Sequence, residues 1–116
     1  MKKILIIEDD ESIHNVIEEL LKKENYDTYN AYSGTEALLL LEKEKYDLIL
    51  LDLMLPGLKG EEIIKKVNNV PIIVLSAKIS SDDKVNCLLS GASDYITKPF
   101  DSKELLARIE VQLRNN

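Results

Sequence analysis

The feature that most constrains the fold is a change of hydrophobic periodicity that repeats along the chain. Three short segments are almost entirely Ile, Leu and Val, as in strands buried on both faces: residues 3–7, 48–51 and 72–75. Between the segments, apolar residues recur three and four positions apart among charged residues, which is typical of amphipathic helices. In the first such stretch they are Ile13, Val16, Ile17, Leu20 and Leu21.

Two more polar segments, residues 26–31 and 93–97, complete a set of five predicted strands. Helices are expected to follow the strands, beginning near residues 11, 34, 60, 81 and 102. Gly91 is expected to end the fourth helix, and Asp101 or Ser102 to cap the last. Strands that alternate with helices favour an α/β fold with a mostly parallel sheet and right-handed crossovers.

Composition limits the classes of protein to which the chain can belong. The 116 residues suit one domain, and 45% hydrophobic with 31% charged residues is the balance of a soluble globular protein. The formal charge of −6 disfavours direct binding of nucleic acid. No apolar run approaches a membrane span, Met1-Lys2-Lys3 does not begin a signal peptide, and a single Cys fits a reducing compartment. We therefore expect a cytoplasmic protein.

Reactive side chains follow the predicted strands. Glu8 and Asp9 follow the first, Asp52 the third, Ser76 the fourth and Lys98 the fifth. In a parallel sheet these carboxyl ends share one edge, where ligands bind. Carboxylates brought together there repel one another unless a cation such as Mg²⁺ holds them. A carboxylate nucleophile, a metal, a lysine and a hydroxyl together describe an aspartyl-phosphate site.

Four segments carry a family resemblance: ILIIEDDE at 4–11, LLDLMLPG at 50–57, VLSA at 74–77 and GASDYITKPF at 91–100. Together they resemble the receiver domain of bacterial two-component response regulators, in order and over the whole chain. The resemblance implies a three-layer (βα)5 fold, which is a doubly wound, parallel, five-stranded sheet of the flavodoxin-like, CheY-like type. It also implies the strand order 2-1-3-4-5.

The resemblance assigns the acidic residues. Asp52 is expected to be the phosphoacceptor. The Mg²⁺ ligands are expected to be Glu8, Asp9, Asp52 and the backbone carbonyl of Met54. Glu8 replaces the commoner Asp, which lengthens the side chain by one methylene and keeps the charge.

The resemblance also assigns residues around the phosphoryl group. Ser76, Ala77 and Lys98 are expected to contact it. Ser76 and Tyr95 match a hydroxyl–aromatic switch pair, and the bond between Lys98 and Pro99 is expected to be cis. Met54 and Lys78 are expected to tune dephosphorylation.

The implied function is a signalling switch rather than an enzyme in the usual sense. A sensor histidine kinase would phosphorylate the domain, and the face made by the fourth helix, fifth strand and fifth helix would change shape. Residues 101–109 resemble receivers of winged-helix transcription factors of the OmpR/PhoB type, so the expected output is transcription. On this reading residues 1–116 are one receiver domain, either a stand-alone protein or the N-terminal fragment of a DNA-binding regulator.

Those regulators form homodimers through charged pairs on the same face. Asp94, Glu104 and Arg108 match the pattern. Asn86, Ser93 and Asn115 depart from it, which weakens the expectation of a dimer.

Four further residues are expected to have structural roles or surface positions. Lys59 stands where relatives place an N-cap residue and cannot accept the capping hydrogen bond. Asp10 is expected to cap the first helix, His14 to be a surface histidine and Cys87 to be a packing residue.

Three alternative functions fit the sequence less well. A small Mg²⁺-dependent phosphohydrolase of the haloacid-dehalogenase type would need a general-acid Asp where Met54 stands. A degenerate receiver that serves only as a docking module would have lost Asp52, Asp9 or Lys98, and all three are present. A flavodoxin-like carrier would need a hydroxyl-rich phosphate loop after the first strand.

Overall fold

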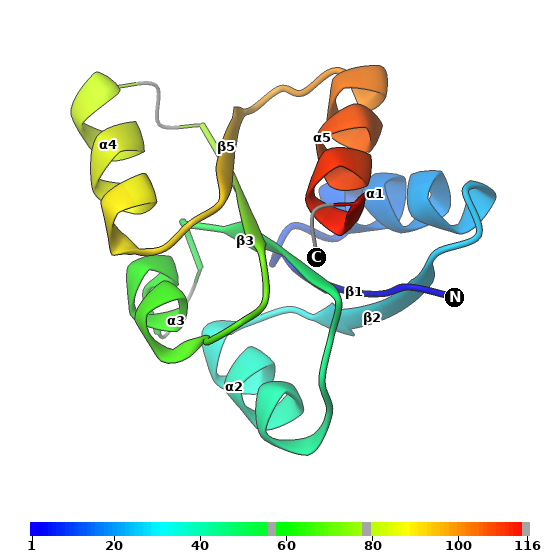
Figure 1. Ribbon diagram of the computed structural model, residues 1–116, viewed down its shortest axis with the longest axis horizontal. Helices are drawn as coiled ribbons and strands as arrows, with labels where there is room; N and C mark the ends of the chain where they lie inside the picture. The colour runs from blue at the N-terminus through cyan, green and yellow to red at the C-terminus, as the bar shows by residue number, and fades with distance from the viewer. Residues whose placement is uncertain (56–57, 78–79, 115–116) are drawn as a thin grey trace.

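A computed structural model describes residues 1–55, 58–77 and 80–114. Strands and helices alternate along the chain as the periodicity predicts (Figure 1). The strands are β1 (Lys3–Ile7), β2 (Asp27–Ala31), β3 (Leu48–Asp52), β4 (Ile72–Ser76) and β5 (Asp94–Thr97). The helices are α1 (Glu11–Lys23), α2 (Gly34–Lys43), α3 (Gly60–Lys66), α4 (Ser81–Ser90) and α5 (Ser102–Arg114).

The five strands form one parallel sheet in the order β2-β1-β3-β4-β5, which confirms the expected fold. All residues of β3 and β4 are buried, because these strands have neighbours on both sides and helices on both faces. Strand β2 lies at the edge, and only its last residue is buried. The two strands with few apolar residues, β2 and β5, begin at Asp27 and Asp94, which is one residue later than the sequence predicts.

Side chains alternate across the sheet and form two hydrophobic cores. Ile4 and Ile6 of β1 pack with α1 and α5, whereas Leu5 and Ile7 pack with α2, α3 and α4. Figure 1 shows α1 and α5 together on one side of the sheet and the other three helices on the opposite side. Cys87 of α4 is buried in the second of these cores, as expected of a packing residue.

Four helices begin with a side-chain cap. At the start of α5, Asp101 accepts a hydrogen bond from the amide of Lys103, as expected. Asp10, Ser33 and Ser80 accept hydrogen bonds from the amides of Ile13, Glu36 and Asp83. The N-cap residue of α3 is Lys59, whose side chain has no acceptor to offer. Gly91 ends α4 with φ +123°, a conformation that L side chains rarely adopt.

The expected surface position of His14 is wrong. Its side chain is completely buried, because the face of α1 against the sheet is formed by His14, Ile17 and Leu21. These residues have the i, i+3, i+7 spacing of one helix face. Val16, which the same pattern placed in the core, is instead 52% exposed.

Three expectations lie outside the described residues: the turn that the Pro56-Gly57 pair favours, and the roles of Lys78 and Asn115. Within the described ranges, no helix has the length and apolar character needed to cross a membrane.

Candidate functional site: an acidic pocket at the carboxyl edge of the sheet

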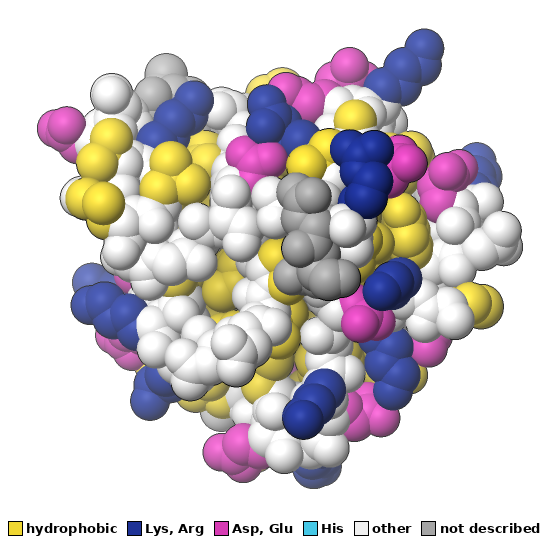
Figure 2. All heavy atoms as spheres, in the orientation of Figure 1, with side chains coloured by type: hydrophobic (Ala, Val, Ile, Leu, Met, Phe, Trp, Pro, Cys, Tyr) yellow, Lys and Arg dark blue, Asp and Glu magenta, His cyan; other side chains and the backbone are white. Residues whose placement is uncertain are grey.

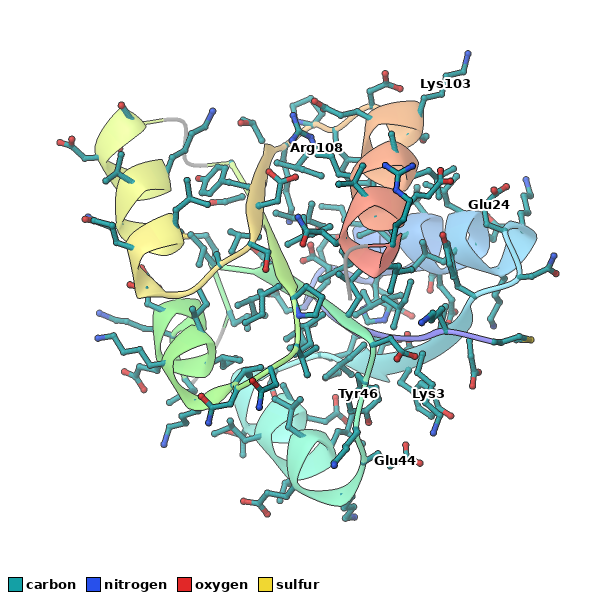
Figure 3. All side chains as sticks on the ribbon, in the orientation of Figure 1. Lys3, Glu24, Glu44, Tyr46, Lys103 and Arg108 are labelled. Carbon is teal, nitrogen blue, oxygen red and sulfur yellow. The ribbon has the colours of Figure 1, made fainter. Side chains whose placement is uncertain are left out.

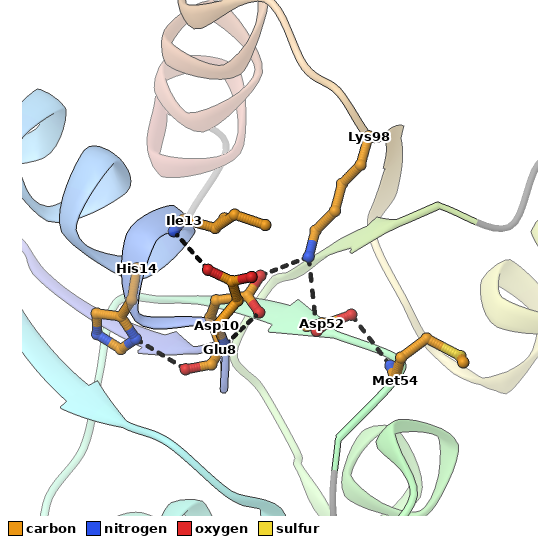
Figure 4. A network of polar contacts seen from close by, with 7 residues as sticks. All are labelled: Glu8, Asp10, Ile13, His14, Asp52, Met54 and Lys98. Atoms are coloured by element: carbon orange, nitrogen blue, oxygen red, sulfur yellow. Dashed lines mark hydrogen bonds and ion pairs between the residues drawn. The ribbon is translucent and has the colours of Figure 1, made fainter.

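Strand order and direction bring the predicted site residues to one edge of the sheet. Glu8 follows β1, Asp52 ends β3 and Ser76 ends β4, and these three strands are neighbours. Ser76 pairs with Thr97 of β5, so Lys98 emerges beside it. Figure 4 shows the side chains of Glu8, Asp52 and Lys98 pointing toward one another at this edge.

Three carboxylates form the acidic pocket. Glu8, Asp9 and Asp52 each offer an oxygen, and these three atoms lie within 4.8 Å of one another. Glu8 and Asp52 are buried, whereas Asp9 is exposed and leaves one side of the group open. Mg²⁺ prefers carboxylate oxygens and retains part of its water shell, so the donor set and its open side fit this ion.

Lys98 bridges the two buried carboxylates. Its Nζ lies 2.5 Å from Oε1 of Glu8 and 3.5 Å from Oδ2 of Asp52. The main-chain N–H of Lys98 donates to the carbonyl of Ser76, and the peptide bond to Pro99 is cis. The ammonium group therefore offsets part of the negative charge that the pocket concentrates.

Burial is the main influence on the ionisation of Glu8. Removal of the carboxyl from water raises its pKa, and the neighbouring Asp52 raises the pKa further. The hydrogen bonds from Lys98 and from the Asp10 amide act in the opposite direction without reversing the shift. Protonation of Glu8 would therefore compete with the binding of a metal ion by this carboxylate.

The main chain around Asp52 is held in place from two directions. The amide of Met54 donates to Oδ1 of Asp52 at 3.0 Å, and the Met54 side chain is exposed. On the other side, a Cβ on Gly60 would lie 2.8 Å from Cα of Leu53 and 3.2 Å from the carbonyl oxygen of Asp52. Glycine at this position therefore lets α3 pack directly against the backbone that carries Asp52.

The two residues of the expected switch pair lie on neighbouring strands. Ser76 is fully buried at the end of β4, and Ala77 next to it is exposed. Tyr95 pairs with Val74 in the β4–β5 ladder and is 8% exposed. Nζ of Lys84, from α4, lies 5.6 Å from the centroid of the Tyr95 ring.

The charged residues expected at a dimer face pair within the chain. Arg108 of α5 donates to Asp94 of β5 at 2.9 Å and to Glu104, one helical turn earlier, at 3.2 Å. Figure 3 shows Arg108 on the side of α5 that is turned toward β5. All three residues thus share one surface, as expected, and the contacts seen there are intramolecular.

Sequence reasoning missed one residue beside the pocket. The ring of His14 lies 2.9 Å from the backbone carbonyl of Glu8 and is part of the network in Figure 4. Its spacing from Ile17 and Leu21 was the signal that could have placed it inward.

Comparison with known proteins agrees with this geometry. Residues 4–110 match the family described as "Response regulator receiver domain". The chain belongs to this family. Receiver domains are signalling switches of two-component systems, interact with histidine kinases and generally bind Mg²⁺ at an acidic pocket.

Solved receiver structures are similar over nearly their whole length. The receiver domain of Francisella response regulator 1452 is 36% identical, with a TM-score of 0.95, 99% of this chain covered and 98% of that chain. A two-component response regulator from Clostridium difficile is 31% identical, with a TM-score of 0.95 and coverage of 98% and 97%. The BeF3-activated N-terminal receiver domain of Klebsiella pneumoniae RstA is 36% identical, with a TM-score of 0.92 and coverage of 97% and 98%.

Proposed function

We propose that this receiver domain is a phosphorylation-dependent switch in which Asp52 accepts a phosphoryl group from the phosphohistidine of a sensor kinase. The observation that carries the proposal is the position of Asp52, a buried carboxylate bridged by Lys98 and grouped with Glu8 and Asp9. A carboxylate oxygen of Asp52 forms the new P–O bond. The P–N bond of the donor breaks, and its electron pair returns to the imidazole. Attack by water later releases inorganic phosphate and restores Asp52.

The surrounding residues have distinct roles in this proposal. Glu8, Asp9, Asp52 and the carbonyl of Met54 would hold Mg²⁺, which supplies positive charge for the phosphoryl oxygens when bound. Lys98 neutralises the acceptor and contacts the transferred group, together with Ser76 and the amide of Ala77. Ser76 and Tyr95 then couple the added charge to the surface formed by α4, β5 and α5.

An apolar groove beside the pocket suits the approach of the kinase. The groove, of about 560 Å³, is lined by residues of α1 and of the segment after β5, among them Ile13, Val16, Pro99 and Phe100. Lys98 also lines it, so a helix docked there lies next to the acidic pocket. We propose that the kinase packs against this groove while its phosphohistidine reaches Asp52.

The output is proposed to be transcription, through a winged-helix effector of the OmpR/PhoB type and a homodimer at the face of α4, β5 and α5. The Asp94, Glu104 and Arg108 cluster on this face and the sequence of α5 support this assignment. The Mg²⁺-dependent phosphohydrolase is not favoured, because Met54 stands where such an enzyme needs its general acid.

Intact-mass measurement after incubation with acetyl phosphate tests the central proposal. We expect one added phosphoryl group with Mg²⁺, none with EDTA and none on Asp52→Asn, which keeps the shape of the side chain. A wild-type protein that accepts no phosphoryl group from acetyl phosphate or from a phosphohistidine donor would overturn the proposal. Continuous release of phosphate from added phosphomonoesters would instead support the hydrolase.

A further inference from the structure

His14 lies behind the acidic pocket and has no role in the proposed transfer. It belongs to α1, and its side chain is completely buried. Nδ1 lies 2.9 Å from the carbonyl oxygen of Glu8, and Nε2 lies 2.7 Å from Oδ1 of Asn30 on β2. The imidazole therefore connects the ends of two neighbouring strands to the first turns of α1.

The directions of two hydrogen bonds follow from acceptors that cannot donate. Nδ2 of Asn30 donates to Oε2 of Glu18 at 2.6 Å, because a carboxylate can only accept. The carbonyl of Glu8 is also only an acceptor, so Nδ1 of His14 carries a proton and donates to it.

His14 donates two hydrogen bonds to the turn after β1. Its ring donates to the carbonyl of Glu8, and its main-chain N–H donates to the carbonyl of Asp10 at 2.9 Å. Asp9 lies between these two carbonyls. The ring of Tyr32 stacks on the imidazole with centroids 4.2 Å apart, which covers His14 on its outer side.

We propose that His14 is a positioning residue of the acidic pocket, whose ring hydrogen bond to Glu8 fixes the main chain that presents Glu8 and Asp9 to one cation. The proposal rests on the proposed function in so far as that cation is the Mg²⁺ required for phosphorylation. Groups that orient metal ligands from behind commonly change metal affinity about ten- to a hundredfold when they are removed.

Two substitutions separate the Glu8 bond from the rest of the imidazole. In His14→Asn the amide nitrogen takes the place of Nδ1, which retains the bond to Glu8 and loses the bond to Asn30. In His14→Gln the amide nitrogen takes the place of Nε2, which retains the bond to Asn30 and loses the bond to Glu8. Both side chains are neutral and smaller than imidazole, so they form a matched pair.

The first measurement is the dissociation constant for Mg²⁺, from amide shifts in NMR titrations of the whole protein. We expect His14→Asn to stay within about twofold of wild type and His14→Gln to bind about tenfold more weakly. Urea unfolding in EDTA shows whether the pair differ in stability. Equal Mg²⁺ affinities in the pair would reduce His14 to a packing residue and overturn the proposal.

The second measurement needs no metal. Hydrogen exchange at the amides of Glu8 and Asp10, which donate to Ala31 O and Glu8 Oε2, should be faster in His14→Gln than in His14→Asn. Should His14→Gln not fold, His14→Met, which fills space without a donor, replaces it. A wild type that binds no Mg²⁺ would refute the proposed function, and equal exchange in the pair would still refute the role of His14.

Discussion

At the scale of single residues, the position of Lys98 governs the charge of the pocket. Its ammonium lies closer to Glu8, at 2.5 Å, than to the proposed acceptor Asp52, at 3.5 Å. A Mg²⁺ ion that took Oε1 of Glu8 as a ligand would compete with this contact. We therefore predict that Lys98 opposes Mg²⁺ binding in the unphosphorylated protein, although it is proposed to contact the phosphoryl group afterwards.

The two effects can be separated with Lys98→Met, which keeps an unbranched apolar side chain and removes the charge. Mg²⁺ should bind about tenfold more tightly, equivalent to ~1.4 kcal/mol, because no internal cation competes for Glu8. Phosphorylation by acetyl phosphate should nevertheless be slower. NMR titration and intact-mass time courses give the two quantities.

Lys103→Met removes an exposed ammonium from the first turn of α5 and is the control for net charge. If Lys98→Met bound Mg²⁺ more weakly than wild type, competition by Lys98 would be wrong.

Glu8 makes stability depend on pH in the metal-free protein. Burial raises its pKa in the folded state, so folding favours the protonated form. The stability that Glu8 contributes is complete below the unfolded value, 4.5, and is lost as the pH rises through the folded value. Glu8→Gln resembles the protonated form and should be more stable than wild type at pH 7 in EDTA.

Urea unfolding from pH 4 to 8 measures this difference, which should shrink toward zero at the acid end of the range. A Glu8→Gln protein that is less stable than wild type at pH 7 would show that the ion pair with Lys98 outweighs the cost of burial.

At the scale of elements, α3 has the weakest start. Lys59 has backbone angles of φ −69° and ψ 146°, in the extended region usual for an N-cap, and lacks an acceptor. Because α3 packs through Gly60 on the main chain beside Asp52, its first turn also supports the site.

Lys59→Ser should therefore raise the free energy of unfolding by about 0.5–1 kcal/mol, since the hydroxyl can accept from an amide of the first turn. Urea denaturation of the whole protein measures the gain. Ser33→Ala, which removes the cap of α2, should lower the free energy of unfolding by about 1 kcal/mol and calibrates the scale. If Ser33→Ala lowers the free energy of unfolding and Lys59→Ser leaves it unchanged, the amides in the first turn of α3 already have other hydrogen-bond acceptors.

The sequence predicts an element correctly where its apolar residues can be buried in only one way. The continuous apolar runs of β1, β3 and β4 can be buried only in the centre of a sheet, and the residues after them must then share an edge. Helix rotation is less constrained. Apolar residues of α1 cover a wide arc, and only packing on the sheet decides that His14 is buried and Val16 exposed.

Side-chain partners were harder to predict than positions. Sequence alone places Lys98 near several carboxylates, and the longer arm of Glu8 brings that carboxylate closest. Likewise, Arg108 was expected to pair across a dimer, but Asp94 and Glu104 lie within its reach in the same chain. These choices depend on distances of a few ångströms that no residue pattern specifies.

At the scale of the whole molecule, acidic residues of the helices gather toward the carboxyl edge of the sheet and basic residues toward the opposite edge. The helices carry acidic residues in their first turns, among them Glu11, Glu36, Glu61 and Asp82. Basic residues occupy the last turns of α1, α2, α3 and α5. Each arrangement stabilises the helix dipole. Because each helix begins at the carboxyl edge of the sheet, the same arrangement places negative charge around the acidic pocket and favours the approach of cations.

The hydrophobic surface is also uneven. Val85, Leu88 and Leu89 of α4 are exposed, Leu89 at 82%. Figure 2 shows hydrophobic side chains at the surface over this helix. The exposed apolar side of α4 and the Asp94–Arg108 pair of β5 and α5 belong to the face through which we propose the homodimer.

If phosphorylation makes this face available, the oligomeric state should depend on Asp52. We expect a monomer of 13.2 kDa without a phosphodonor and a dimer of twice that mass with acetyl phosphate and Mg²⁺, measured by light scattering after gel filtration. Leu89→Asp should accept the phosphoryl group and remain monomeric, because a buried unpaired carboxylate is costly. Leu39→Asp, at a 54% exposed leucine of α2, is the matched control and should still dimerise. A phosphorylated wild type that stays monomeric would leave the switch intact and refute its proposed dimer. A Leu89→Asp protein that dimerises would place the interface on another face.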